Sequence, residues 1–232
     1  MNPDAFPILT RFPAAHPDRL QLYTLGTPNG VKVSILLEEL GALYEAHRVE
    51  FGDEGTGSDE FRSLARNGKI PAILDPDGPG GKPLALFESG AILLYLAEKH
   101  GRFLGRDAAA RQEVIQWLFW QMAGMGPMFG QIGFFFRYAG AEYEDKRPLA
   151  RYVAEAQRLL GVLDRRLEGR EWVAGDYSIA DMAMFGWVRG LDVHYGAGEL
   201  VGLDRFDRVA EWLERGLARP AVQRGLAVPA EE

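Results

Sequence analysis

The stretch that decides the fold covers residues 20–40 and reads LQLYTLGTPNGVKVSILLEEL. Residues 20–25 are mainly apolar and include an aromatic, which is typical of a β-strand, whereas residues 31–40 place their apolar side chains at helical spacing. The loop 26–30 therefore leads into a helix N-terminus, where unpaired backbone N–H groups carry partial positive charge and can hold an anion. We hypothesise that this anion is a thiolate belonging to a bound small molecule.

The composition limits the classes of protein that the chain can represent. Its 232 residues suffice for one large domain or two small ones, and 47% apolar with 25% charged residues is typical of a folded soluble protein. A formal charge of −7 argues against a nucleic-acid partner, because phosphate binding needs a basic face. The sequence shows no membrane-length apolar run and no secretory signal, so we expect a cytoplasmic protein without a membrane partner.

The chain contains no cysteine, which excludes disulfides, thiolate metal ligands and a cysteine nucleophile. Its four histidines include no close pair at metal-ligand spacing, so we expect no metal. The nucleotide-binding patterns GxGxxG and GxxxxGK are absent, as is the GxSxG pattern of hydrolases. Any sulfur chemistry must therefore come from a bound small molecule.

The first hundred residues predict the element order β-α-β-α-β-β-α. Ahead of the first predicted strand, residues 1–19 carry four prolines and are interpreted as an arm on the surface or on a partner subunit, with a partly disordered tail as the alternative. An alternating stretch over 44–51 predicts a second strand, which makes a βαβ unit with parallel strands. A short helix is expected over 59–66.

Two short apolar runs, 70–75 and 84–87, flank a turn rich in proline and glycine and predict an antiparallel hairpin. Pro71 cannot donate to a ladder, so it must lie at an edge or among the first residues of its strand. A helix follows up to His100, with Ser89 as the candidate N-cap.

From Asp107 onward a helical pattern replaces the strand pattern. One apolar stripe comprises Ile115, Leu118, Phe119 and Met122, and another covers residues 149–167. Ser178–Asp181 resembles a capping box that opens a further helix, and a last helix ends before Pro220. The predicted organisation has three parts: an arm over 1–19, an α/β domain over 20–101 and an all-α domain over 107–232.

Five motifs occur in one order along the chain: TPNG (27–30), KIPAI (69–73), LFESGAILLYL (86–96), QWLFWQ (116–121) and GPMFGQ (126–131). With the predicted element order, they resemble the cytosolic glutathione transferases. Within these they are similar to the Nu-class subgroup, which contains bacterial disulfide-bond reductases and the transferase-like domain of a yeast nitrogen-regulation prion protein. The resemblance covers roughly residues 20–220.

The resemblance implies an α/β thioredoxin-like N-terminal domain followed by an all-α domain, which is the glutathione transferase fold. It implies an enzyme that uses reduced glutathione, one or two per subunit, without metal or nucleotide, and a homodimer in which the N-terminal arm can take part. The favoured reaction is reduction of small disulfides by glutathione thiols. Conjugation to apolar electrophiles, or peroxide reduction, is the enzymatic alternative, and a non-catalytic glutathione-binding or regulatory protein is the alternative of another class.

The resemblance also implies roles for residues near the thiol. Thr27 and Asn29 would donate hydrogen bonds to the sulfur and so lower the thiol pKa. Ile70, before a cis Pro71, would pair its backbone with the cysteinyl part, and Lys69 could approach the glycyl carboxylate. Each residue also has a plainer interpretation, as turn former, strand-end proline or solvated lysine.

The ends of the tripeptide fall on a second group of residues. Ser89 would take the γ-glutamyl carboxylate at a helix N-terminus while Glu88 pairs with the ammonium, although Ser89 as a simple cap and Glu88 as a solvated residue are the alternatives. Arg151 falls where the subgroup has an arginine that reaches a glutathione carboxylate, and Arg147 is close enough to be confused with it. Tyr23 is a rival thiol partner, but its place inside the strand favours packing.

Aromatic residues in and after the last motif suit an apolar co-substrate, although some of them are expected in the core: Phe129, Phe134, Phe135, Phe136 and Tyr138. The chain also departs from the subgroup at two places. Thr56 replaces a glutamine of the glycine-rich loop, and residues 133–136 replace a histidine-rich segment. Both departures leave the co-substrate open.

Overall fold

The computed structural model describes residues 1–230 and divides them into two units. Unit 1 comprises residues 1–100 together with the segment from Pro220 onward, and unit 2 comprises Gly101–Arg219. The sequence pattern changes near the same place in the chain as the first boundary. The C-terminal segment differs from the sequence-based division, which assigns it to the helical domain although the structure groups it with unit 1.

Unit 1 is built on a four-stranded sheet. Its elements are, in chain order, α1 (Ile8–Arg11), β1 (Leu20–Thr24), α2 (Gly30–Leu40), β2 (Tyr44–Arg48), α3 (Asp59–Leu64), β3 (Ala72–Asp75), the short 3-10 helix η1 (Pro79–Gly81), β4 (Leu84–Phe87), α4 (Ser89–His100) and α11 (Pro220–Leu226). The strand order is β2-β1-β3-β4, with β1 and β2 parallel and the other two pairs antiparallel. This topology confirms the βαβ unit, the hairpin and the thioredoxin-like domain.

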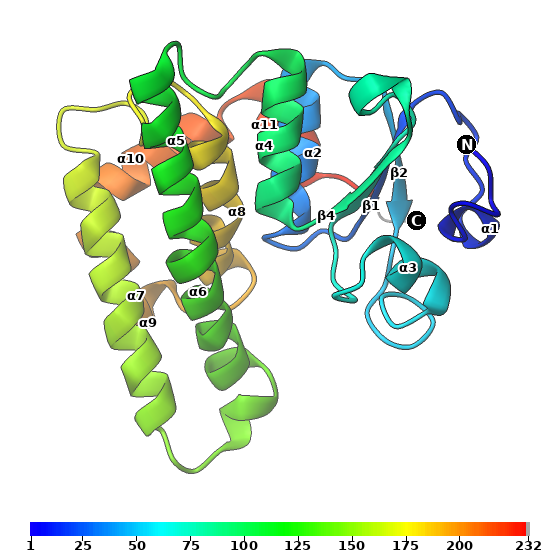
Figure 1. Ribbon diagram of the computed structural model, residues 1–232. Coiled ribbons are helices and arrows are strands. Elements are labelled where there is room, and N and C mark those ends of the chain that lie inside the picture. Colours follow the sequence, from blue (N-terminus) through cyan, green and yellow to red (C-terminus); the bar gives the residue numbers. More distant parts are fainter. Residues whose placement is uncertain (231–232) are drawn as a thin grey trace. The chain divides into compact units, whose positions relative to one another are not determined.

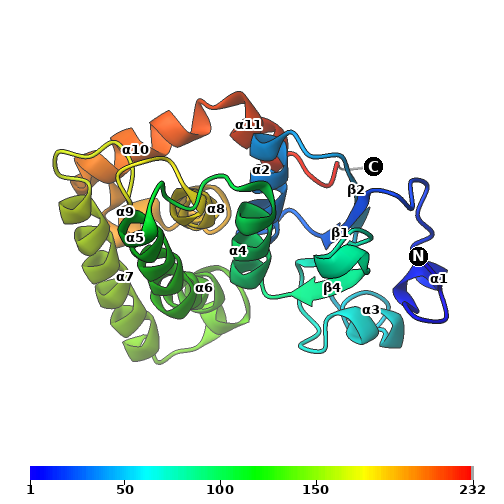
Figure 2. The same ribbon diagram turned by 45° about the horizontal axis from the view of Figure 1, so that its top comes forward.

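Helices cover both faces of the sheet (Figures 1 and 2). On one face α2 packs against α4 and α11, and on the other α1 packs against α3. Side chains alternate along the strands accordingly, because successive residues point to opposite faces. Tyr23, Ala72 and Leu74 belong to the core cluster under α1 and α3, and the alternating residues Leu22 and Ile73 are fully buried toward the other helices.

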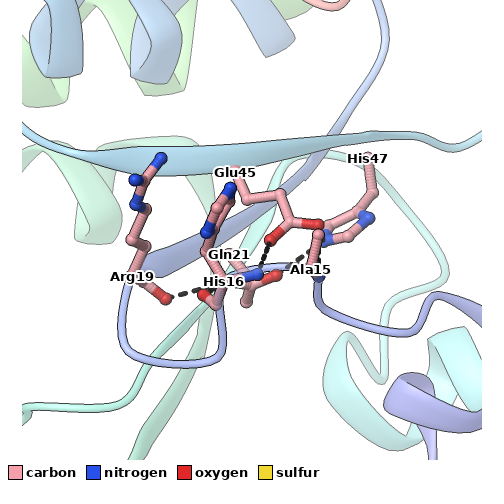
Figure 3. A network of polar contacts seen from close by, with 6 residues as sticks. All are labelled: Ala15, His16, Arg19, Gln21, Glu45 and His47. Carbon is pink, nitrogen blue, oxygen red and sulfur yellow. Dashed lines mark hydrogen bonds and ion pairs between the residues drawn. The ribbon is translucent and has the colours of Figure 1, made fainter.

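The arm belongs to unit 1 and packs on the sheet of its own chain. The apolar residues of α1 are buried in the same core cluster as Tyr23. The Glu45 carboxylate on β2 accepts hydrogen bonds from the backbone N–H groups of Ala15 (2.9 Å) and His16 (2.8 Å) (Figure 3). The Gln21 amide donates to the His16 carbonyl at 3.0 Å. These bonds hold the arm against the β1–β2 edge of the sheet, so it is not a loose tail.

Helix α11 is bound to α2 through close backbone contact. A Cβ on Gly225 would lie 2.5 Å from Ile35 Cα, so only glycine allows this approach. Ser34 Oγ donates to the Gly225 carbonyl at 2.6 Å, and Arg224 Nε donates to Glu38 Oε2 at 2.6 Å. No helix is predicted after Pro220, because the segment 220–226 is short and has few apolar side chains to mark a helical face.

Unit 2 is helical, as predicted. Its elements are α5 (Ala108–Trp120), the π-helical turn η2 (Gln121–Met125), α6 (Gly126–Ile132), the π-helical turn η3 (Gly133–Arg137), the 3-10 helices η4 (Ala139–Glu142) and η5 (Leu203–Arg205), α7 (Arg147–Arg166), α8 (Ile179–Val193), α9 (Gly198–Val201) and α10 (Asp207–Leu217). The capping box before α8 is confirmed, with Ser178 as the N-cap and Asp181 bonded back to it.

The apolar stripe predicted at the start of unit 2 is only partly confirmed, because Leu118 is buried and Ile115 and Met122 are half-buried but Phe119 is exposed. Phe119 is 62% exposed, whereas Val114 and Leu118 are buried and Gln121 and Met125 continue the same face through η2. A shift of one residue turns a helix face by about 100°. The error arose because apolar residues occur on both sides of this helix, so spacing alone did not identify the face that packs.

Candidate active site

Gly30 shapes the loop between β1 and α2. A Cβ at this position would lie 2.0 Å from the Leu25 carbonyl oxygen and 2.5 Å from Thr24 Oγ1, so a side chain does not fit. The Gly30 N–H donates to Thr27 Oγ1 at 3.2 Å, and the Val31 N–H donates to the Thr27 carbonyl at 3.0 Å. The first bond uses a lone pair of the Thr27 hydroxyl and leaves its hydrogen available to a ligand.

Asn29 is the residue directly before α2. Its backbone is already helical, with φ −85° and ψ −38°, and its half-buried side chain does not cap the helix. Thr27 and Asn29 therefore both lie at the positive end of α2, where hydroxyl, amide and backbone N–H groups can donate to an anion.

The Ile70–Pro71 peptide bond is cis, as the resemblance implies. Pro71 directly precedes β3, whose first residue, Ala72, pairs with β1 and β4. Strand β3 therefore starts two residues later than the predicted 70–75, and Ile70 lies just beyond both ladders. Its backbone is thus placed to pair with an extended ligand at the strand end. Lys69 is exposed.

Ser89 is the first residue of α4, and not the N-cap as predicted. The Ile92 N–H donates to the Glu88 carbonyl at 2.9 Å, so Glu88 holds the position before the helix. Glu88 has φ 73°, a left-handed conformation that is uncommon for a residue with a side chain and often found at functional sites. Its carboxylate accepts a hydrogen bond from Asn67 Nδ2 at 3.4 Å. Ser89 is buried and its hydroxyl oxygen accepts a hydrogen bond from Lys32 Nζ at 3.3 Å.

Lys32 is the residue of this site that the sequence analysis missed. Only 1% of its surface is exposed, and burial lowers the pKa of its amine to about 7, with the nearby Glu88 carboxylate acting in the opposite direction. A signal existed in the sequence, since Lys32 interrupts an otherwise apolar helix start. That signal does not show which residues lie beside Lys32 in the folded protein.

Tyr23 has the environment of a packing residue. Its ring stacks on His47 with centroids 4.8 Å apart, and Phe12 of the arm meets it edge-on at 5.8 Å. Burial, followed by the nearby Glu45 carboxylate, raises the pKa of the Tyr23 phenol. Figure 3 shows His47 and Glu45 together beside the arm, so this corner of the sheet is taken up by the arm.

The predicted site residues of unit 2 differ in their surroundings. Both arginines are exposed, but Arg147 is bound to Asp145 at 2.7 Å, and Arg151 lies one turn further along α7. Among the aromatics, Phe129 is fully buried and belongs to the core, as was expected for some of them. Phe134, Phe136 and Tyr138 are between 36% and 56% exposed, and are thus the members of the set that can face a co-substrate.

Within residues 1–230, no three carboxylate or imidazole groups lie close enough together to bind a metal ion. No helix in that range has the length and apolar character needed to cross a bilayer. What the site does offer is hydrogen-bond donors and positive helix ends, which suit an anionic ligand.

The fold and the site define a class of protein: a thioredoxin-like domain with a cis-proline before its third strand, followed in the chain by a helical unit. Residues 18–98 match the family model for the glutathione S-transferase N-terminal domain. The chain is 43% identical over 209 residues to the disulfide-bond oxidoreductase YfcG of Escherichia coli (strain K12). The matched region covers 89% of this chain and 94% of that protein.

Two solved structures have higher sequence identity to this chain than YfcG has. A glutathione transferase from Pseudomonas putida, with one glutathione disulfide bound per subunit, has a TM-score of 0.97 and 62% identity and covers 99% of this chain and 100% of that one. A glutathione transferase from Burkholderia graminis, with two glutathione molecules per subunit, has a TM-score of 0.97 and 61% identity, with coverages of 100% and 97%. The chain belongs to the glutathione transferase family.

Proposed function

We propose that this protein is a Nu-class glutathione transferase that reduces small disulfides with the thiols of glutathione. The observation that carries the proposal is the β1–α2 loop, where Thr27 and Asn29 present donors at the positive end of α2 in a chain without cysteine. The sulfur nucleophile must then come from the ligand. The name of YfcG and the glutathione disulfide in the Pseudomonas putida structure support the same reaction.

The proposed reaction has two exchange steps. The thiolate of one glutathione attacks a sulfur of the substrate disulfide, forms a mixed disulfide and releases one substrate thiolate, which takes a proton. The thiolate of a second glutathione attacks the glutathione sulfur of the mixed disulfide. The products are glutathione disulfide and two substrate thiols, so two glutathiones are oxidised for each disulfide reduced.

The rest of the tripeptide is proposed to lie along the same end of the sheet. Ile70 pairs its backbone with the cysteinyl part, and Lys69 approaches the glycyl carboxylate. Ser89 and the α4 N-terminus take the γ-glutamyl carboxylate, and Glu88 pairs with the ammonium. Arg151 is proposed to contribute a further carboxylate contact, for which its exposed guanidinium is suited.

We expect steady-state assays to show a higher rate of glutathione oxidation with a small disulfide such as 2-hydroxyethyl disulfide than of conjugation with an aryl halide. The reverse order would favour conjugation, the second candidate, which the exposed aromatics Phe134, Phe136 and Tyr138 support. Glutathione binding is measured first, by retention on immobilised glutathione and by calorimetry. A protein that does not bind at millimolar glutathione would contradict both enzymatic functions.

We further propose a cytoplasmic homodimer. Leu43 and Phe51, which flank the edge strand β2, are 72% and 64% exposed, and large exposed apolar side chains are typical of interfaces. Size-exclusion chromatography with light scattering is expected to give twice the chain mass of 25.8 kDa. Replacing both residues by Ser should shift the protein toward the monomer, and a monomeric wild type would contradict the proposal.

A further inference from the structure

Helix α1 of the arm packs on the same core as the segment that leads to the cis-proline. Ile8 and Leu9 are buried in α1, and both belong to the core cluster that contains Ala65 and Ile70. Helix α1 also contacts α3, which ends directly before Ala65 (Figures 1 and 2). The side chain of Ile70 is therefore held in a core that the arm completes, while its backbone lies beyond both sheet ladders.

A polar connection runs from the arm to the same segment through the glycine-rich loop. The Arg11 guanidinium binds the Glu54 carboxylate at 3.2 Å and also donates to the Glu54 carbonyl group. Because that carboxylate is exposed, the ion pair contributes little by itself, and it is the second bond that holds the loop backbone. The Thr56 carbonyl oxygen would lie 3.3 Å from a Cβ on Gly68, so the loop packs closely against this turn. Lys69 follows Gly68 directly.

The segment 65–70 depends on such contacts because the sheet does not fix it. The ladders of β3 begin at Ala72, and Gly68 has φ 62°, a conformation that glycine adopts freely. A backbone that pairs with an extended ligand gives higher affinity when it is ordered before the ligand arrives, since otherwise part of the binding free energy is used to order it.

We propose that the arm is a positioning element for glutathione, in which Ile8 and Arg11 hold the segment 65–70 so that Ile70 and Lys69 meet the cysteinyl–glycyl half of the ligand. This inference rests on the proposed glutathione site. Both arm residues act through the segment and the glycine-rich loop. The γ-glutamyl end is assigned to the start of α4, so the arm acts mainly on the other half of the tripeptide.

The test is calorimetry with two ligands that have no titrating thiol: S-methylglutathione and its glycyl amide, which lacks the charge of the glycyl carboxylate. Ile8→Ala leaves a cavity beside the cluster and is expected to weaken binding of S-methylglutathione about 10-fold, because it loosens the contacts of both Ile70 and Lys69. The glycyl amide should lose only about 3-fold, since it has no carboxylate for Lys69 to approach. Ile8→Val should restore most of the affinity for both ligands.

Two further variants separate positioning from stability. Leu96→Ala makes a comparable cavity at a fully buried position of α4, on the other face of the sheet. It should lower the thermal unfolding midpoint as Ile8→Ala does, but keep the wild-type affinity for both ligands. Arg11→Met removes only the connection to Glu54 and should weaken S-methylglutathione about 3-fold, with Lys82→Met at an exposed turn as its control. Because Arg11 is exposed, this variant keeps the test decisive if Ile8→Ala does not fold.

The outcomes distinguish this inference from the proposed function. Wild-type affinities in Ile8→Ala, or an equal loss for the two ligands, would show that the arm contributes only to stability and would overturn the inference while leaving glutathione binding in place. A wild type that binds S-methylglutathione and its glycyl amide equally would overturn it too, because Lys69 would then make no contact to position. Absence of S-methylglutathione binding to the wild type would overturn both.

Discussion

The double variant Thr27→Val/Asn29→Ala is expected to raise the thiol pKa of bound glutathione by about 2 units. A hydrogen bond to a charged group contributes about 1.5–3 kcal/mol, which corresponds to about 1–2 pKa units for each donor removed, so two donors at the lower end of this range give about 2 units. At pH 7 the thiolate fraction falls about 100-fold, and the greater nucleophilicity of a more basic thiolate restores about 10-fold, so disulfide reduction should slow about 10-fold. The pH–rate profile of the reaction measures both changes.

Matched variants distinguish donation to sulfur from a change in the loop. Thr27→Ser keeps the hydroxyl that accepts from the Gly30 N–H and should retain the wild-type profile. Asn29→Asp places a carboxylate beside the thiolate and should raise the thiol pKa more than Asn29→Ala. An unchanged pH–rate profile in the double variant would remove both residues from the catalytic role.

Replacing Asp181 by Ala is expected to lower the free energy of unfolding by about 3–5 kcal/mol, because several buried donors lose their acceptor. Asp181 is fully buried, and its carboxylate accepts from the N–H of Val173 (2.9 Å), the N–H of Ser178 (3.0 Å) and Trp212 Nε1 (2.9 Å). It thus joins the start of α8 to α10. Urea unfolding measures the loss, and Asp192→Ala, at an exposed position of the same helix, should change it by less than about 0.5 kcal/mol.

Asp181 also predicts an unusual pH dependence. Burial raises the pKa of its carboxyl to about 6, although the hydrogen bonds it accepts act in the opposite direction. The pKa in the folded protein thus lies above its ordinary value of 3.8, so the folded state binds a proton first as the pH falls. Relative to Asp181→Asn, the wild type should gain stability between about pH 6 and pH 4. A difference that stays constant over this range would show that the carboxyl titrates normally.

Much of the fold was predictable from the sequence because it is encoded by local patterns. Alternating and helical spacing identified the β1–α2 unit and the β3–β4 hairpin, and the four residues 178–181 identified the cap of α8. The glutathione-binding candidates came from motifs that resemble a family. Each of these signals lies within a short segment, so it can be recognised without knowledge of the rest of the chain.

Contacts between distant segments were decided only by the tertiary structure. Lys32 and Ser89 are 57 residues apart, and no local pattern pairs them. Ser34 meets Gly225 at a separation of 191 residues, through a carbonyl group that every residue carries. The sequence by itself therefore determined most of the elements, the family and the loop that we propose offers donors to a thiolate. Only the fold brought a buried amine to the start of α4, because packing selects partners that spacing along the chain does not specify.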